Sequence, residues 1–171
     1  METYSAADMA DILHRAAMLY TASNIPIDYG TGEKYTSVEV HMLKYIIDNP
    51  GKTVTDMSQD WDKTKAAVSQ MMKRMAEKGL IAWREAPDSK KKQLCFATAK
   101  GVELNERHLE YDDKVFGKTL ELLGETCSWE EIAVCFHVLE EYAKARRRKH
   151  YRSDPNIIKG SRRGAREGGA G

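Results

Sequence analysis

The segment from Thr53 to Leu94 constrains the fold most strongly, because it orders a short helix, a turn, a longer helix, a glycine and a hairpin. The short helix is expected over Thr55–Trp61, with the Thr55 hydroxyl as its N-terminal cap and apolar residues spaced four apart. A longer helix is expected to begin after Thr64, another capping residue, and to end before Gly79. This order predicts a winged helix-turn-helix.

The longer helix is expected to be amphipathic, with one face in a core and the other in solvent. Its apolar residues follow the three-and-four spacing of such a helix: Ala67, Val68, Met71, Met72 and Met75. The opposite face carries small, polar and basic side chains, which can approach base edges and phosphates in a DNA major groove. The candidate DNA contacts on this face are Thr64, Lys65, Ala66, Ser69, Gln70 and Lys73.

A basic hairpin follows the longer helix. We expect a strand over Leu80–Arg84, a tip at Pro87–Lys92 and a returning strand over Gln93–Thr98. From Lys63 to Lys92 there are nine Lys or Arg and three Asp or Glu, a local charge of +6 in a chain whose total is +1. Such a patch is typical of contact with a phosphate backbone, although a charge run can also be a solvated face. The candidate contacts to the minor groove or its phosphates are Lys90, Lys91 and Lys92.

Further helices are expected on both sides of this segment. Residues Ser5–Thr21 and Lys100–Leu123 carry apolar side chains at helical spacing, and Ser128 with Glu131 forms a capping box before a last helix. Terminal helices with wide apolar faces bury these faces more easily against a second copy of the chain than by covering the core of their own copy. The sequence therefore predicts a homodimer, with the capping of a monomer's own core as the alternative.

The predicted fold class is mainly α with a small β-hairpin wing, that is, a winged helix-turn-helix with flanking dimerisation helices. Residues 36–98 are expected to form the DNA-binding lobe, and residues 1–35 and 99–150 the helical dimerisation region. Residues 151–171 are expected to be a disordered tail, because they are basic and rich in glycine. This tail would either add nonspecific phosphate contacts or remain an inert solvated end.

Four stretches of the chain carry a family resemblance: Thr36–Glu39, Lys73–Ile81, Pro87–Lys91 and Thr98–Gly101. Together they resemble the DNA-binding lobe of the MarR family of bacterial transcriptional regulators. The resemblance implies a homodimer on a palindromic operator in double-stranded DNA, a repressor released by a small-molecule effector, and a wing tip held by Asp88. The chain departs from the family pattern at Lys90, where arginine is usual, and at Gln70, where arginine is frequent.

The resemblance also implies an effector pocket, for which the candidate residues are His41, Tyr45, His108 and Asp112. His108 and Asp112 are spaced four residues apart and project from one helix face, a spacing that suits a divalent metal. Zinc-sensing members of the resembled family take ligands from the same two helices. We expect no cofactor and no metal, with a zinc-responsive regulator as an alternative and hydrogen bonding across the helix junction as another.

Several classes of protein are disfavoured. The sequence has no GxSxG motif and no phosphate-binding glycine loop, so we expect no enzyme. It has no apolar run long enough to span a membrane and no secretory signal, and its three cysteines form no CxxC pair, so we expect a cytoplasmic protein. A winged-helix module that binds an acidic protein partner is the other alternative. The lysine-rich hairpin tip favours DNA, because protein interfaces are depleted in lysine.

Overall fold

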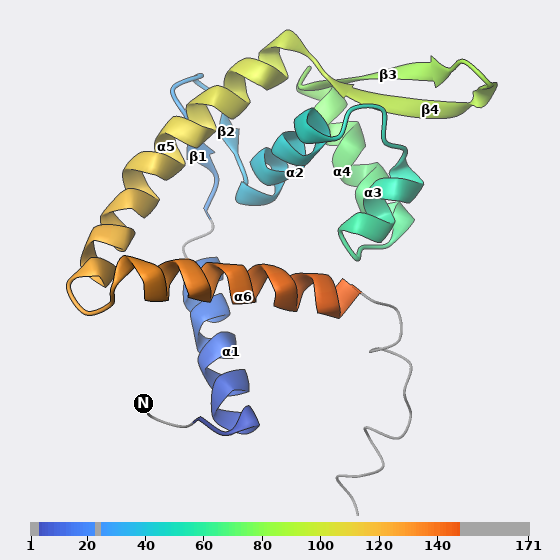
Figure 1. Ribbon diagram of the computed structural model, residues 1–171. Coiled ribbons are helices and arrows are strands. Elements are labelled where there is room, and N and C mark those ends of the chain that lie inside the picture. Colours follow the sequence, from blue (N-terminus) through green and yellow to red (C-terminus); the bar gives the residue numbers. More distant parts are fainter. Residues whose placement is uncertain (1–3, 23–24, 148–171) are drawn as a thin grey trace, which may run out of the picture. The chain divides into compact units, whose positions relative to one another are not determined.

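The computed structural model describes residues 4–22 and 25–147. Within them the elements are α1 (Ala6–Ala22), β1 (Ile27–Asp28), β2 (Lys34–Tyr35), α2 (Ser37–Asp48), α3 (Val54–Asp60), α4 (Lys65–Glu77), β3 (Ile81–Ala86), β4 (Ser89–Ala97), α5 (Ala99–Gly124) and α6 (Trp129–Arg147). The predicted fold class, mainly α with a small hairpin wing, is confirmed (Figure 1).

The contacts divide the chain into two compact units, residues 1–117 and 118–171. The first unit contains everything from α1 to the first part of α5, and the second contains the rest of α5 and α6. The predicted basic tail at 151–171 lies outside the described residues. Within the described ranges, no helix is both long and apolar enough to cross a lipid bilayer.

Side-chain caps fix where the helices of the first unit begin. Thr64 caps α4 as predicted, since its hydroxyl accepts a hydrogen bond from the Ala67 N–H. The cap of α3 is Thr53 rather than the predicted Thr55, because Thr53 and Asp56 form a reciprocal capping box. Gly79 ends α4 as predicted, and its φ of +72° lies in the left-handed region that favours glycine.

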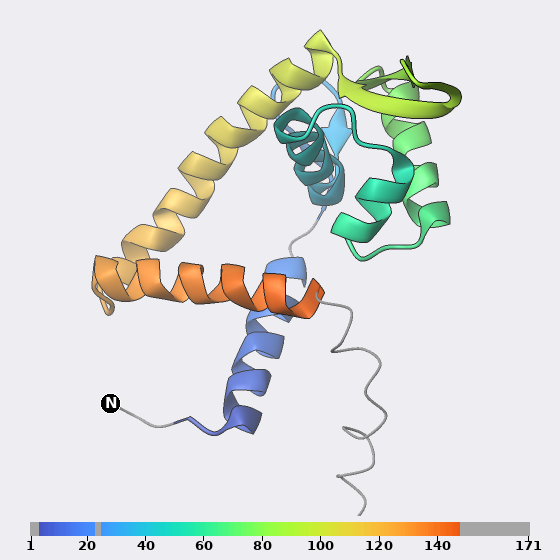
Figure 2. The same ribbon diagram turned by 45° about the vertical axis from the view of Figure 1, so that its right-hand side comes forward.

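The core of the first unit lies among α2, α3, α4 and the start of α5. The helices α3 and α4 contact each other, and α2 packs beside them (Figures 1 and 2). The buried hydrophobic side chains come from all of these elements and from the two hairpins: Tyr29, Tyr35, Val40, Met42, Leu43, Ile46, Met57, Val68, Met71, Met72, Met75, Leu80, Ile81, Cys95 and Leu104. The inner face of α4 is therefore held, which leaves its outer face free to bind a partner.

The hairpin formed by β3 and β4, which we call the wing, extends away from the helices (Figure 1). The segment before α3 joins its base, because the Gly51 N–H donates to the Cys95 carbonyl and the Cys95 N–H donates to the Lys52 carbonyl. The predicted tip at Pro87–Lys92 is too long. Ala86 pairs with Ser89, so β4 begins before the three lysines and they are not part of the turn. The register shifts between Glu85, which pairs with Gln93, and Ala86, so the three lysines form a bulge with no residue opposite them on β3.

A second, very short hairpin precedes α2. β1 and β2 pair through two residues each, Ile27 with Tyr35 and Asp28 with Lys34. The Asp28 carboxylate holds the turn together, because its Oδ1 accepts hydrogen bonds from the N–H groups of the residues at positions 30, 31 and 32. These hydrogen bonds also lower the pKa of Asp28.

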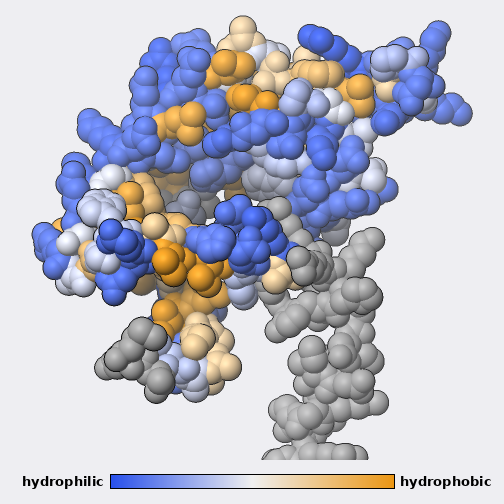
Figure 3. Space-filling model, viewed as in Figure 1, coloured by the Kyte–Doolittle hydropathy of each residue, from blue (hydrophilic) through white to orange (hydrophobic). Residues whose placement is uncertain are grey.

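The helices α1 and α6 expose much of their apolar surface. None of the residues of α1 is buried, and Ile132 is the buried hydrophobic residue of α6 within the described range. Figure 3 shows hydrophobic side chains at the surface of these helices. The exposed large hydrophobic residues on them are Met9, Ile12, Met18, Leu19, Tyr20, Trp129, Val134, Phe136, Val138, Leu139 and Tyr142. Apolar area of this extent is typical of a surface that binds a partner.

Candidate nucleic-acid interface

The outer face of α4 presents all six residues that the sequence predicts as major-groove contacts. Thr64, Lys65, Ala66, Ser69, Gln70 and Lys73 are all exposed. On the opposite side Val68, Met71 and Met72 are buried, so the helix cannot turn this face inward without unpacking the core. The first N–H groups of α4 have no partner within the helix, apart from the one that Thr64 caps, and such groups bind phosphates readily.

The wing places its three lysines on one strand beside α4. Lys90, Lys91 and Lys92 are exposed, and they lie in the bulge of β4 between Ser89 and Gln93. Their three positive charges are thus concentrated in one irregular stretch of the strand. Asp88 lies in the two-residue turn between the strands and is exposed, and its role in holding the wing tip stays a prediction.

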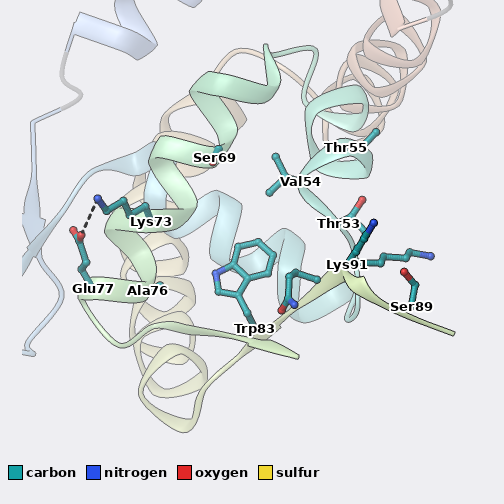
Figure 4. Close-up of a pocket in the computed structure, with 12 residues that line it drawn as sticks. Thr53, Val54, Thr55, Ser69, Lys73, Ala76, Glu77, Trp83, Ser89 and Lys91 are labelled. Atoms are coloured by element: carbon teal, nitrogen blue, oxygen red, sulfur yellow. Dashed lines mark ion pairs between the residues drawn. The ribbon is translucent and has the colours of Figure 1, made fainter. Parts of the chain in front are cut away.

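A groove of about 990 Å³ separates α4 from the wing (Figure 4). Its lining residues come from the start of α3, from α4 and from both wing strands: Thr53, Val54, Thr55, Ser69, Lys73, Ala76, Glu77, Trp83, Ser89, Lys91, Lys92 and Gln93. Trp83 supplies the large apolar surface of this groove, and Lys73 pairs with Glu77 at 3.9 Å on α4. A hollow with lysines on both walls can hold an anionic chain such as a nucleic-acid backbone.

A second cluster of polar side chains joins α2 to α5. His41, His108 and Asp112 offer two nitrogens and one carboxylate oxygen, and these ligand atoms lie within 4.8 Å of one another. His108 Nε2 lies 3.0 Å from Asp112 Oδ2, and the rings of His41 and His108 meet edge to face with centroids 4.9 Å apart. The structure therefore brings together three of the four residues predicted for an effector pocket.

Tyr45, the fourth predicted pocket residue, is directed toward α3 instead. Its hydroxyl donates a hydrogen bond to the Asp60 carboxylate, and its ring meets the Trp61 ring edge to face with centroids 6.1 Å apart. Lys52 lies 3.3 Å from the same carboxylate oxygen. Tyr45 thus anchors α3 against α2, because the carboxylate that completes its hydrogen bond belongs to α3.

The cluster of His41, His108 and Asp112 has the donor types that a divalent ion requires. Burial lowers the pKa of His108, against the opposing effect of the Asp112 carboxylate, and neutral imidazole is the form that binds metals. Nitrogen and carboxylate oxygen are both zinc ligands. Ligand atoms around a tetrahedral zinc ion lie roughly 3.3 Å apart, so His41 would have to move closer.

One feature of the same cluster departs from an ordinary zinc site. The Nδ1 atom of His108 is buried and has no hydrogen-bond partner among the described residues, whereas a metal-bound histidine usually has its second nitrogen oriented by such a partner. The Tyr29 ring covers His108 edge to face at 5.5 Å, and burial raises the pKa of Tyr29 to about 12, so its hydroxyl keeps its proton. The residues therefore fit an ion in donor type, without the usual outer-shell contact.

No protein-family model matches the chain. The chain is 27% identical over 90 residues to the uncharacterised HTH-type transcriptional regulator YhjH of Bacillus subtilis (strain 168), a match of 53% of this chain and 51% of that protein. It thus spans about half the length of this curated relative.

The structure resembles three solved proteins, of which SlyA is a transcriptional regulator. The first is SlyA, with a TM-score of 0.62, 20% identity and coverage of 81% of this chain and 93% of that chain. The second is FabT of Streptococcus pneumoniae in complex with DNA, with a TM-score of 0.57, 18% identity and coverage of 80% and 90%. The third is ZitR of Lactococcus lactis, a zinc-responsive MarR family member, with a TM-score of 0.55, 20% identity and coverage of 82% and 99%. The chain has the fold of the MarR family.

The MarR fold agrees with the resemblance inferred from the sequence. Two of the proteins in these comparisons, SlyA and YhjH, are transcriptional regulators, and FabT was solved in complex with DNA. At identities of about 20%, the likeness extends to the fold and not to individual residues, so the roles of α4 and the wing are argued from their own geometry.

Among the residues that line the groove but were not predicted as contacts, Trp83 and Thr53 carry a signal that is readable in the sequence. Trp83 was assigned only to a strand, although strand alternation turns it away from the exposed neighbours Ala82 and Arg84. Thr53 was passed over for Thr55 as the cap of α3. The aspartate three residues after Thr53 completes a capping box there, a signal that the sequence already contained.

Proposed function

We propose that this protein is a cytoplasmic, homodimeric DNA-binding transcriptional regulator of the MarR family that acts as a repressor released by a small-molecule effector. One observation carries the proposal: Ser69 and Lys73 on the exposed face of α4 line the same groove as Lys91 and Lys92 of β4. A helix of 13 residues with small and polar side chains on its outer face can enter a major groove. The wing would then reach the adjacent phosphates or minor groove.

The exposed apolar faces of α1 and α6 support the homodimer. Leu19 is 76% exposed and Trp129 60% exposed, and large apolar side chains in such numbers are costly to leave in water. A two-fold pair would present two α4 helices to two half-sites about one helical turn apart, which matches a palindromic operator. Doubling the base contacts also raises the affinity that a single small lobe could reach.

Two single variants are expected to distinguish base reading from phosphate binding. Gln70→Ala should lower the preference for the operator, because an amide side chain on the outer face of α4 can pair with a base edge. Lys91→Ala should weaken binding to every sequence alike and reduce the slope of log K against log salt by roughly one. Both are measured by titrating operator and scrambled duplexes at several salt concentrations. Identical behaviour of the two variants would contradict this division.

The experiment that tests the proposed function is a titration of the protein with DNA from its own promoter and with a scrambled duplex, at two salt concentrations. We expect tighter binding to the promoter and affinity that falls steeply as salt rises. Equal binding of both duplexes would contradict a sequence-specific regulator. Absence of binding to either, with zinc added or not, would favour a module that binds an acidic protein partner.

The cluster of His41, His108 and Asp112 favours a second candidate function, a zinc-responsive regulator of the same family. The two imidazoles and the carboxylate would hold the ion between α2 and α5, and the ion would supply a link between these helices. α2 precedes the helix-turn-helix and α5 follows the wing, so an ion bound to both elements can bias the position of the DNA-binding segment.

Zinc should therefore change DNA affinity in the wild type, by about tenfold for an ordinary coupling between two sites. Removing the ion with a chelator should reverse the change. His108→Ala should abolish both zinc binding in calorimetry and the effect on DNA, whereas His137→Ala, which removes an exposed histidine from α6, should leave both intact. DNA affinity that responds to neither zinc nor chelator would eliminate the metal and leave the cluster as a pocket or a helix junction.

A further inference from the structure

An ion pair between a half-buried lysine and a buried glutamate fixes the end of α4 that lies away from its N-terminal cap. Lys78 is the C-terminal cap of the helix, and its Nζ donates to Glu39 Oε1 at 2.7 Å. The Glu39 side chain is 7% exposed and belongs to α2, 39 residues earlier in the chain. This contact joins α4 to the N-terminal end of α2.

Glu39 also accepts hydrogen bonds at the start of α2, and these hold its carboxylate in place. Its Oε2 accepts hydrogen bonds from the backbone N–H and the hydroxyl of Thr36, which completes the capping box of α2. Burial opposes ionisation of Glu39, yet the hydrogen bonds from Lys78 and Thr36 outweigh it and lower its pKa. The carboxylate is therefore charged, and Thr36 and Lys78 together hold it in place.

A second set of contacts closes a ring around Lys78. Its ammonium lies 4.9 Å from the centre of the Tyr35 ring, and the Tyr35 hydroxyl donates to Glu33. Lys100, in the first turn of α5, pairs with Glu33 at 2.9 Å and donates to the Lys78 carbonyl at 3.0 Å. Lys78 is thus the point where β2, α2, α4 and α5 meet. We call this cluster the α4 clasp, and its members are Glu33, Tyr35, Glu39, Lys78 and Lys100.

The α4 clasp is better suited to fixing the orientation of α4 than to raising the free energy of unfolding. A buried ion pair is often no more stabilising than well-packed apolar residues, but it accepts few arrangements of its partners. The 13 residues of α4 span about 20 Å, at 1.5 Å per residue. A tilt of about 5° at Lys78 would therefore displace the far end by roughly 1.7 Å, more than the distance range of a hydrogen bond tolerates.

We infer that Glu39 and Lys78 are positioning residues that set the angle of α4 and so determine how well the protein discriminates between DNA sequences, without touching DNA. The inference rests on the proposed function of α4 as the base-reading helix. It differs from a role in phosphate binding, because Lys78 is already paired and lies at the opposite end of α4 from Thr64.

The test compares the operator-to-scrambled affinity ratio of the wild type with that of three variants, Lys78→Met, Glu39→Gln and the double variant. Glutamine can keep the capping box, and the double variant leaves no buried charge without a partner, so it is expected to fold. We expect the ratio to fall about tenfold in the double variant, the size of one weakened base contact. The salt slope should stay unchanged, because no phosphate contact is lost.

One control variant and one competing prediction make the result decisive. Asp48→Asn removes an exposed Lys44–Asp48 pair of 2.6 Å on the same α2 helix and should leave the ratio as in the wild type. Charge alone predicts that Glu39→Gln raises the affinity for both duplexes and leaves their ratio unchanged, whereas the inference predicts a lower ratio. A folded double variant with the wild-type ratio would overturn the inference. A wild type with no sequence preference would instead overturn the proposed function.

Discussion

Replacing Gly101 by alanine is expected to lower the free energy of unfolding by about 3 kcal/mol, as overpacking against a fixed backbone does. A Cβ atom at this position would lie 2.2 Å from the Leu80 carbonyl oxygen and 3.1 Å from Leu43 Cδ1. The carbonyl cannot simply turn away, because it accepts the Thr98 N–H at 3.0 Å at the base of the wing. The added methyl group must push α5 away from the turn after α4.

Gly117→Ala is the matched control, since it changes the same residue type within the same helix. Among the described residues, no atom other than the helix's own nearby backbone lies within 4 Å of a Cβ built there. Alanine also favours a helix by up to about 1 kcal/mol over glycine. Thermal unfolding should show a melting temperature lower by roughly 10 °C for Gly101→Ala and unchanged or higher for Gly117→Ala. Equal stability of the two variants would mean that α5 does not lie against Leu80 as described.

Replacing Lys90, Lys91 and Lys92 together by alanine is expected to weaken DNA binding by on the order of a hundredfold at low salt. Each lysine that neutralises a phosphate contributes about 0.9 to the slope of log K against log salt, so the slope should fall by about 2.7. All three side chains are exposed on β4, so their removal should leave the fold intact. The measurement is DNA affinity over a series of salt concentrations.

A control variant with the same loss of charge distinguishes phosphate contacts made by the wing from an effect of the protein's total charge. Lys34, Lys44 and Lys114 lie on β2, α2 and α5, and replacing them by alanine removes the same three charges away from the wing. Exposed charges more than about 8–10 Å from a phosphate are largely screened at physiological salt, so the slope should hardly change. Equal losses in the two triple variants would show that net charge, rather than the wing, carries the binding.

The helix-turn-helix could be predicted because its signals are local. The four-residue spacing of buried methionines on α4, the cap at Thr64 and the stop at Gly79 all lie within one stretch of chain, and the structure confirms each. The exposed face of α4 follows from the same spacing. The base-reading roles of residues on that face remain predictions, since they depend on a partner.

Other features depend on contacts that no local pattern reveals. The β1–β2 hairpin has two-residue strands, too short to show an alternation of apolar and polar residues, and its turn is made by the Asp28 carboxylate. The ion pair between Glu39 and Lys78 joins residues 39 positions apart. The wing turn was predicted too long, because lysines resemble loop residues and only the pairing of Ser89 with Ala86 shows that β4 begins before them.

Selection of bound duplexes from a random-sequence pool, followed by sequencing, tests the central claim most directly. The full-length protein is used at moderate salt, so that nonspecific phosphate binding does not dominate. A homodimer that reads bases with α4 should enrich a two-fold symmetric sequence whose half-sites lie about one helical turn, 10–10.5 base pairs, apart. Recovered sequences no different from the starting pool would contradict a sequence-specific DNA-binding regulator.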